Sequence, residues 1–422
     1  MDKKLQNKKI LILGAYNSDI EIINAAKKMG VYTIVTDNHT DWNDAPAKYV
    51  ADEAWDISWS DMEALEKRCR EANVDGCMAG FSERRIICAQ KLSSIMGMPF
   101  YADGADLDMI CEKKRFKEAC QKCGVRDAIS FSCEDDIRFP VIVKPADNGG
   151  SRGITVCYTR EEFERAYVKA MECSDSKSVV IEEYITADEV MVYYTVHDGK
   201  ATVSAMCDRY MNKFQKNITQ LPIGYYFPSK YLDVLMKFND EKFRNLISFL
   251  GIKNGLIAFQ AFVVGNDIIP FDPTYRLDGT MAYHITSEMN NTNVLEMLIR
   301  YSLTGSMGVF EEIEKKENPY MKNPCFELPV LLTSGTITQI RGMEKVREIK
   351  EVIHIHTIHN VGEMMKMKAD FSQMLCRIHI CAKNDDTLYD IVKYIYDNIE
   401  VLDENGNDMI IGREICEKIR KD

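Results

Sequence analysis

Strand and helix patterns alternate along residues 9–103, and this alternation constrains the fold more than any other feature of the chain. Apolar runs and amphipathic periods predict a strand at 9–14, a helix at 19–29, a strand at 31–37, a helix at 61–72 and a strand at 76–80. Parallel strands need crossover connections of this kind, which are right-handed in nearly all cases. The segment is therefore predicted to form a parallel, Rossmann-like α/β sheet.

Gly14 opens the first strand-to-helix turn and Asp37 ends the second predicted strand, which superficially resembles a dinucleotide site. The turn holds a single glycine, however, whereas the dinucleotide fingerprint G-x-G-x-x-G holds three. We therefore expect this segment to be a scaffold or to line a substrate site, and NAD binding is not predicted.

Length and composition narrow the class of protein. The 422 residues predict two or three domains, and the 46% apolar and 28% charged contents are typical of globular proteins. The net charge of −12 argues against a nucleic-acid or anionic-membrane surface but permits a local positive pocket. The apolar run at residues 10–13 is too short for a signal peptide, and no stretch has the length of a membrane helix. We expect a cytoplasmic protein that binds neither nucleic acid nor membrane.

Cysteines and histidines give weak metal signals. The 14 cysteines lack framework spacing, as expected for thiols in a reducing compartment. Cys120 and Cys123 form a C-x-x-C within a predicted helix, but no second pair accompanies them. His354, His356 and His359 lie close together, and the first two share a strand face, yet no carboxylate or cysteine stands at ligand spacing. We do not predict a metal site at either place.

The strongest functional signal is the run F-P-V-I-V-K-P-A-D-N-G-G-S-R-G-I at residues 139–154. An apolar strand carries Lys144 at its end and passes into a loop with Gly149, Gly150 and Gly153. The strand fixes the ammonium group, and the glycines let backbone N–H groups approach an anion closely. The loop has no Walker A ending. It predicts a polyphosphate site, with a flexible hairpin and a surface lysine as the alternative.

A predicted hairpin at residues 256–276 adds oxygen ligands. Period two places Gln260 on one strand opposite a second strand that carries Asp272, Thr274 and Arg276 on one face. An amide, a carboxylate and a hydroxyl that converge make a site suited to Mg²⁺. A simple turn role for Asp272, which precedes Pro273, is the alternative.

The order of these motifs resembles that of the ATP-grasp enzymes. In chain order the motifs are Lys113 on a helix, Lys144 with its glycine loop, Glu182-Glu183-Tyr184-Ile185, Glu189, Gln260 and Asp272-x-Thr274-x-Arg276. The resemblance implies a mixed α/β and α+β fold in three parts. These are a Rossmann-like pre-ATP-grasp domain at 1–103, an ATP-grasp domain at 104–318 with a lid at about 140–186, and a small mixed β C-terminal domain at 319–422, similar to that of biotin carboxylase.

Residue roles carried over by position are what this resemblance implies. ATP would be bound by Lys113, Lys144, Asn148, Gly149, Gly150, Ser151, Gly153, Glu182, Glu183, Ile185 and Glu189. The two lysines would hold the α- and β-phosphates, Glu182 and the backbone of Glu183 and Ile185 would read adenine, and Glu189 would bind the ribose. Mg²⁺ or Mn²⁺ would be held by Gln260, Asp272 and Thr274. Arg276 and Lys144 would be the catalytic residues.

The metal positions depart from the superfamily pattern. Gln260 is usually a glutamate, although the carbamoyl-phosphate synthetase branch has glutamine there. Asp272 occupies a position where the superfamily has a glutamate, and Thr274 occupies one where it has an asparagine. Gln260 and Asp272 together supply one negative charge where two are common, so a lower affinity for Mg²⁺ is expected.

The resemblance implies an ATP-dependent carboxylate–amine ligase that forms an acyl phosphate from small-molecule substrates, amino acids among them. Two alternatives stay open: carboxyphosphate or carbamoyl-phosphate chemistry, and a non-catalytic nucleotide-binding protein with a degraded metal site. Asp278 and His284 are candidates for the acceptor pocket, as is Arg341 from the last domain. Related enzymes often dimerise, but no homodimer interface is identifiable from the sequence.

Overall fold

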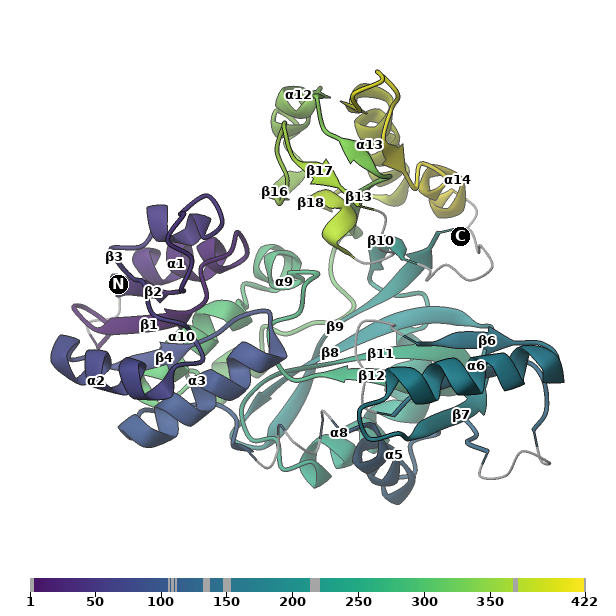
Figure 1. Ribbon diagram of the computed structural model, residues 1–422, viewed down its shortest axis with the longest axis horizontal. Helices are drawn as coiled ribbons and strands as arrows, with labels where there is room; N and C mark the ends of the chain where they lie inside the picture. Colours follow the sequence, from purple (N-terminus) through teal and green to yellow (C-terminus); the bar gives the residue numbers. More distant parts are fainter. Residues whose placement is uncertain are drawn as a thin grey trace.

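The computed structural model describes residues 4–104, 107, 110, 112–131, 137–146, 153–212, 221–366 and 371–420, with the backbone alone for 113 and 114. Its elements form a parallel sheet near the N-terminus, a small sheet, and a large antiparallel sheet that continues into the C-terminal part (Figure 1). The predicted mixed α/β fold class is confirmed. Among the described residues, no helix combines the length and apolarity needed to cross a membrane.

The N-terminal sheet is parallel, as the alternation predicts. Its described strands have the order β3-β2-β1-β4, with bounds β1 (Lys9–Leu13), β2 (Tyr32–Thr36), β3 (Glu53–Trp55) and β4 (Gly76–Met78). The accompanying helices are α1 (Asp19–Lys28), η1 (Pro46–Tyr49), α2 (Met62–Ala72) and α3 (Glu83–Met96). The sequence prediction did not include β3, which is very short, or α3. Asp61 caps α2 by accepting a hydrogen bond from the backbone N–H of Ala64 at 3.1 Å.

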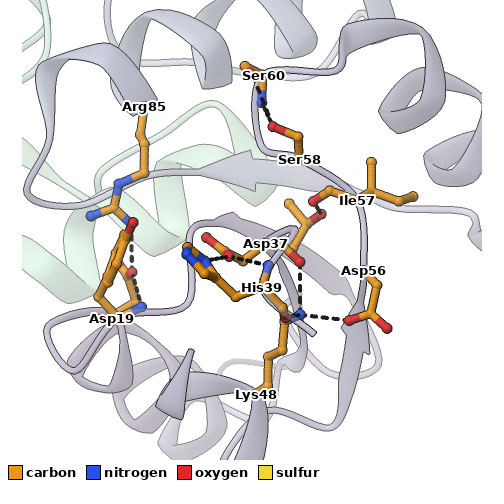
Figure 2. Close-up of polar contacts among 11 residues, drawn as sticks. Asp19, Asp37, His39, Lys48, Asp56, Ile57, Ser58, Ser60 and Arg85 are labelled. Carbon is orange, nitrogen blue, oxygen red and sulfur yellow. Dashed lines mark hydrogen bonds and ion pairs between the residues drawn. The ribbon is translucent and has the colours of Figure 1, made fainter. Parts of the chain in front are cut away.

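The first strand-to-helix turn is filled by a side chain of the protein itself (Figure 2). Gly14 has φ +110°, and a Cβ there would lie 1.7 Å from Nη1 of Arg85. The Arg85 guanidinium donates to the Leu13 carbonyl at 3.0 Å and to the buried Asp19 carboxylate at 2.5 Å. The space in which a dinucleotide phosphate would approach the turn is thus occupied, which fits the scaffold role expected for this segment.

Asp37 is also held within its own loop. Its carboxylate accepts from the backbone N–H of His39 at 2.9 Å and lies 2.5 Å from the His39 ring (Figure 2). The buried Lys48 donates to the Asp37 carbonyl at 2.8 Å and to Asp56 at 2.7 Å. These contacts fix the loop after β2.

A small antiparallel sheet carries the lysine strand. In the described chain it has the order β6-β5-β7, with bounds β5 (Val141–Pro145), β6 (Thr155–Cys157) and β7 (Val179–Glu183), and α6 (Arg160–Cys173) packs on it. Alternate residues of β5, such as Val141 and Val143, join Phe163 of α6 in a core separate from the rest of the molecule. Thr159 caps α6 by accepting from the N–H of Glu162.

The large sheet is antiparallel and crosses the predicted boundary at residue 319. Its order among the described residues is β12-β11-β8-β9-β10-β13-β18-β16, with β20 paired to β13. The bounds are β8 (Asp188–His197), β9 (Lys200–Met211), β10 (Pro222–Phe227), β11 (Gly255–Val264), β12 (Asp267–Thr274), β13 (Cys325–Leu332), β16 (Val352–Thr357), β18 (Met374–Cys381) and β20 (Ile410–Ile411). Because β10 pairs with β13, the last part of the chain extends this sheet.

Helices connect these layers. They are α5 (Lys113–Lys122), α7 (Leu232–Val234), η3 (Leu235–Asn239), α8 (Asp240–Phe249), α9 (Tyr283–Asn290), α10 (Val294–Thr304) and α11 (Phe310–Glu314). α10 packs on α1 and β4 of the N-terminal sheet, and a Cβ at Gly76 would lie 2.2 Å from the Ser302 carbonyl oxygen. α9 contacts β16 and β18, so it lies between the N-terminal and C-terminal parts (Figure 1).

Short elements complete the C-terminal part. They are β14 (Gly335–Thr336), β15 (Gln339–Arg341), α12 (Met343–Arg347), β17 (Met364–Met365), η4 (Phe371–Gln373), α13 (Asp385–Asn398), β19 (Glu400–Leu402) and α14 (Ile415–Ile419). A second apolar core fills this region, built around Phe326, Ile378 and Ile395.

Candidate active site

Glu182 lies between two lysines. Lys144 comes from β5, next to β7, which carries Glu182, and Lys117 comes from α5. Each lysine pairs with a different oxygen of the carboxylate, and all three side chains are largely buried. Burial would raise the pKa of Glu182, but the two ammonium groups outweigh it and hold the pKa below its ordinary value of 4.5. The carboxylate is therefore ionised at neutral pH.

The sequence analysis did not predict Lys117 as a site residue, although the sequence contains an indication of it. It lies four residues after Lys113 on α5, so the two share a helix face. Its ammonium group also donates to Ser130 Oγ at 2.6 Å and lies 3.4 Å from Asp127. The side chain of Lys113 itself is outside the described set.

Gly153 is the described end of the glycine loop, whereas Asn148, Gly149, Gly150 and Ser151 lie outside the described residues. Gly153 has φ +81°, and a Cβ there would lie 2.8 Å from Pro145 Cγ and 2.9 Å from Cys173 Cβ. Only glycine fits this position without strain. The described contacts thus explain the glycine by packing of the loop against β5 and α6.

The segment predicted to read adenine lies at the edge of the small sheet. Glu183 pairs with Ile129 in both directions: its backbone N–H donates to the Ile129 carbonyl at 2.9 Å, and its carboxylate accepts from the Ile129 N–H at 3.0 Å. The Glu183 N–H is therefore already used within the protein. Ile185 follows in the connection between β7 and β8.

Glu189 faces Arg209 across paired strands. The two residues are directly opposite on β8 and β9, and Arg209 Nη1 lies 2.5 Å from Glu189 Oε2. Burial raises the pKa of Glu189, and the Arg209 charge opposes that shift. Arg209 also lies over the ring of Phe271. Arg209 is a site residue that the sequence analysis missed, because a lone arginine on a strand carries no motif.

Gln260 and Asp272 are directly opposite on β11 and β12, as the period-two pattern predicts. The Gln260 amide nitrogen donates to Asp272 Oδ2 at 3.1 Å. One extra residue in β12 makes a bulge beside this pair. Thr274 is buried opposite Ala258, deeper than the exposed Asp272. The Asp272 carboxylate and the Gln260 amide group thus lie together at the edge strand of the sheet.

The ribose and metal candidates share one face of the large sheet. Gln260 is opposite Met191, and Phe262, two residues further along β11, is opposite Glu189. Side chains of directly opposed residues lie on the same face, and so do residues two apart. Gln260, Phe262 and Glu189 therefore line one face, whereas Phe259 faces the other side, where it contacts Phe116 of α5 and Phe243 of α8.

Arg276 contacts the N-terminal part of the molecule. Its Nη1 donates to the Leu277 carbonyl at 2.9 Å, and its Nη2 lies 3.4 Å from Glu83 at the start of α3. Its Nε is buried without a hydrogen bond in the described structure. Glu83 stands 193 positions away and carries no sequence signal that links it to Arg276.

Each of the three acceptor candidates contacts a different partner in the described structure. The Asp278 carboxylate accepts from the backbone N–H of Thr280 at 2.9 Å, which is the turn role of an aspartate before glycine. Arg341 is half exposed and pairs with Glu400 on β19 at 2.6 Å, so it stabilises a strand pair. His284 lies beside Glu21 of α1 at 3.2 Å.

Three comparisons with known proteins bear on the family of this chain. The D-ala D-ala ligase C-terminus family model matches residues 112–233, which include Lys144, Glu182 and Glu189. Formate-dependent phosphoribosylglycinamide formyltransferase of Wolinella succinogenes is 24% identical over 273 residues, 62% of this chain and 67% of the relative.

Solved structures share the whole architecture. Phosphoribosylglycinamide synthetase from Anaerococcus prevotii matches 94% of this chain and 100% of that chain, with TM-score 0.75 and 19% identity. L-amino acid ligase from Bacillus licheniformis matches 95% and 100%, with TM-score 0.78 and 16% identity. The motif order and these matches have one explanation: the chain belongs to the ATP-grasp superfamily of ATP-dependent ligases.

Proposed function

We propose that the protein is an ATP-dependent carboxylate–amine ligase that acts on small molecules through an acyl phosphate. The observation that carries the proposal is the common face of Glu189, Gln260 and its neighbour Asp272 on the large sheet, with the Lys144–Glu182 pair supplied by the small sheet. A nucleotide bound along this face has its ribose at Glu189 and its phosphates toward Asp272 and Arg276.

Lys144 and Glu182 would exchange partners when ATP binds. Without a ligand, two ammonium groups hold the Glu182 carboxylate. With ATP, the adenine amino group would take a Glu182 oxygen, and Lys144 would turn its ammonium to the phosphates, as its flexible stem permits. The Glu183 carbonyl and the Ile185 N–H would complete the adenine contact. Lys113 and the loop residues Asn148, Gly149, Gly150, Ser151 and Gly153 are proposed to hold the triphosphate.

The metal candidates fit a Mg²⁺ ion in part. Asp272 supplies an exposed carboxylate and Gln260 an amide oxygen at the edge of the sheet. Thr274 is buried, so its hydroxyl would serve only if the strand end opened. Bound Mg²⁺ would neutralise phosphate charge, and the single carboxylate predicts that millimolar rather than micromolar metal is needed.

The reaction needs no protein nucleophile. A substrate carboxylate oxygen forms a bond to the γ-phosphorus while the bond from that phosphorus to the bridging oxygen breaks, which releases ADP. An amine nitrogen then forms a bond to the acyl carbon, phosphate leaves with the electron pair of the C–O bond, and the amine loses a proton. Lys144 and Arg276 would stabilise the charge on the transferring phosphoryl group. The small sheet has its own core, so it is able to move as a lid that excludes water.

Phosphate release with pools of amino acids and small carboxylates tests the proposal. With Mg²⁺-ATP, we expect release that depends on one acid–amine pair and falls in Lys144→Ala and Asp272→Ala. Lys169→Ala, an exposed lysine of α6, is the matched control and should behave as wild type. Release that needs no acceptor, or that survives in both site variants, would contradict the ligase proposal.

Gln260 favours a second candidate, carboxyphosphate-type chemistry with bicarbonate as the acid. Glutamine at this position is the feature shared with the carbamoyl-phosphate synthetase branch. Phosphate release that requires added bicarbonate, measured in degassed buffer, would support this candidate over an organic acid.

A further inference from the structure

Histidines from distant parts of the chain surround Glu21. His284 Nε2 lies 3.2 Å from Glu21 Oε2, and His354 Nε2 lies 3.1 Å from Glu21 Oε1. His356 Nδ1 lies 3.5 Å from the same Oε1. The carboxylate comes from α1, His284 from α9, and the other two from β16. The sequence analysis found no carboxylate for these histidines because Glu21 is 263 positions from even His284.

The spacing of these atoms matches one metal coordination sphere. One ligand atom each from Glu21, His284 and His354 lie within 4.8 Å of one another. Ligand atoms around a tetrahedral zinc lie about 3.3 Å apart when each is about 2.0 Å from the metal. The distances of 3.2 and 3.1 Å from Glu21 to the two histidines therefore suit a shared ion. His356, whose Nδ1 lies 3.5 Å from Glu21 Oε1, borders this group but is not part of it.

The alternatives to a cation are less favourable. An anion is disfavoured because the Glu21 carboxylate is at the centre of the group. Full protonation of the histidines is disfavoured because the rings of His284 and His354 stack at 3.7 Å, where two imidazolium charges would repel.

Neighbouring groups hold the cluster in place. The fully buried His379 ring lies 5.3 Å from the His284 ring, and its Nε2 lies 2.8 Å from the Thr280 carbonyl, which fixes the proton on Nε2. His354 Nε2 is buried and makes no hydrogen bond in the described structure, although it faces Glu21. A nitrogen in that state is suited to coordination.

We propose that Glu21, His284 and His354 bind one Zn²⁺ that joins the N-terminal α1 and C-terminal β16 to α9. Imidazole ligands favour zinc over Mg²⁺, so this site is distinct from the proposed nucleotide metal at Asp272. The three protein ligands would occupy three of the four positions of a tetrahedral zinc. The proposal does not depend on the ligase reaction.

Zinc stoichiometry measured on the full chain tests the site. The protein is stripped with a chelator, kept reduced, titrated with Zn²⁺ alone against a chromophoric chelator, and analysed by mass spectrometry for bound metal. We expect one zinc per chain, and a loss of affinity of about 100-fold in His354→Ala and in the isosteric Glu21→Gln. Added zinc should raise the melting temperature of the wild type and not that of His354→Ala.

Matched controls separate this site from other metal-binding groups. His359→Ala removes a histidine that pairs with Glu363 outside the cluster, and it should keep the zinc. Asp272→Ala and the double variant Cys120→Ser/Cys123→Ser should keep it too. Cobalt substitution should give visible d–d bands without a thiolate charge-transfer band. The proposal is overturned by the absence of stoichiometric zinc, by its retention in both His354→Ala and Glu21→Gln, or by a thiolate band.

Discussion

Two carboxylates, the buried Glu182 and the partly buried Glu21, are surrounded by nitrogen groups of different kinds. Glu182 lies between the ammonium groups of Lys144 and Lys117, whereas Glu21 lies among the imidazoles of His284 and His354. Ammonium groups are charged at neutral pH and are able to turn to an anionic ligand. Imidazoles are mostly neutral there and offer lone pairs to a cation. The same acidic side chain thus suits an anion site in one region and a cation site in the other.

The two regions also differ in how their residues meet. The proposed nucleotide face, lined by Glu189, Gln260 and Asp272, is built by neighbouring strands. Register alone therefore brings Glu189 to Arg209 and Gln260 to Asp272. The Glu21 cluster needs the packing of α1, α9 and β16, which are distant in the sequence. Strand pairs are local features that survive small domain movements, whereas the cluster depends on the assembled molecule.

Loss of Lys144 should have the largest effect on activity. Lys144→Ala removes a charge that the transferring phosphoryl group needs, and we expect kcat/KM for phosphate release to fall by about 10²- to 10³-fold. The measurement is steady-state phosphate release, with Lys169→Ala as control and the Kd of ATP by calorimetry as a second readout. A change below about threefold would mean that Lys144 pairs with Glu182 and does not act on the phosphoryl group. The proposed contrast, an anion site at Glu182 and a cation site at Glu21, would then fail.

Loss of Arg209 should have the largest effect on stability. Arg209→Ala leaves the largely buried Glu189 without its partner, and removal of one partner from a largely buried ion pair costs about 3 kcal/mol. We expect the melting temperature to fall by about 5 °C or more. The double variant Glu189→Gln/Arg209→Met, which leaves no unpaired charge, should recover part of the loss. Equal losses in the single and double variants would argue against this electrostatic cause.

The sequence predicts those parts of the fold that follow from local pattern. Alternation predicts the parallel strands β1, β2 and β4, and period two predicts that Gln260 and Asp272 converge. The assignment to the ATP-grasp superfamily, made from the order of motifs, is confirmed. The domain boundaries and the roles of the individual site residues stay predictions.

Residues that meet through tertiary packing could not be predicted in this way. Lys117 was overlooked because lysines on helices are usually solvated, and Arg209 because a single strand arginine has no motif. Glu83 and Glu21 reach Arg276 and His284 only through packing of the N-terminal sheet against later segments. No spacing rule connects residues so far apart, since their separation in the chain says nothing of their distance in the fold.

Acid should weaken the ion pairs of Glu182 with Lys144 and Lys117, because these pairs require the ionised carboxylate. That pKa is lowered from 4.5 in the folded protein, so the interaction stabilises the fold fully above pH 4.5 and is lost as the pH falls toward the folded-state pKa. Below pH 4.5, the melting temperature of the wild type should therefore fall more steeply with decreasing pH than that of Glu182→Gln. Parallel curves would show that the lysines do not stabilise the ionised form.

The smallest effect is expected for Glu83→Gln. Glu83 is more than half exposed, and its 3.4 Å contact with Arg276 is long, so its loss should cost at most about 0.5 kcal/mol. Arg276 keeps its contact with the Leu277 carbonyl, and phosphate release should change by about threefold or less. Arg276→Ala should instead lower release by about 10²-fold, because the guanidinium itself is proposed to contact the phosphoryl group. If the two variants lost activity equally, Glu83 would have to bind the substrate directly. The acceptor pocket would then include the carboxylate of Glu83 at the start of α3.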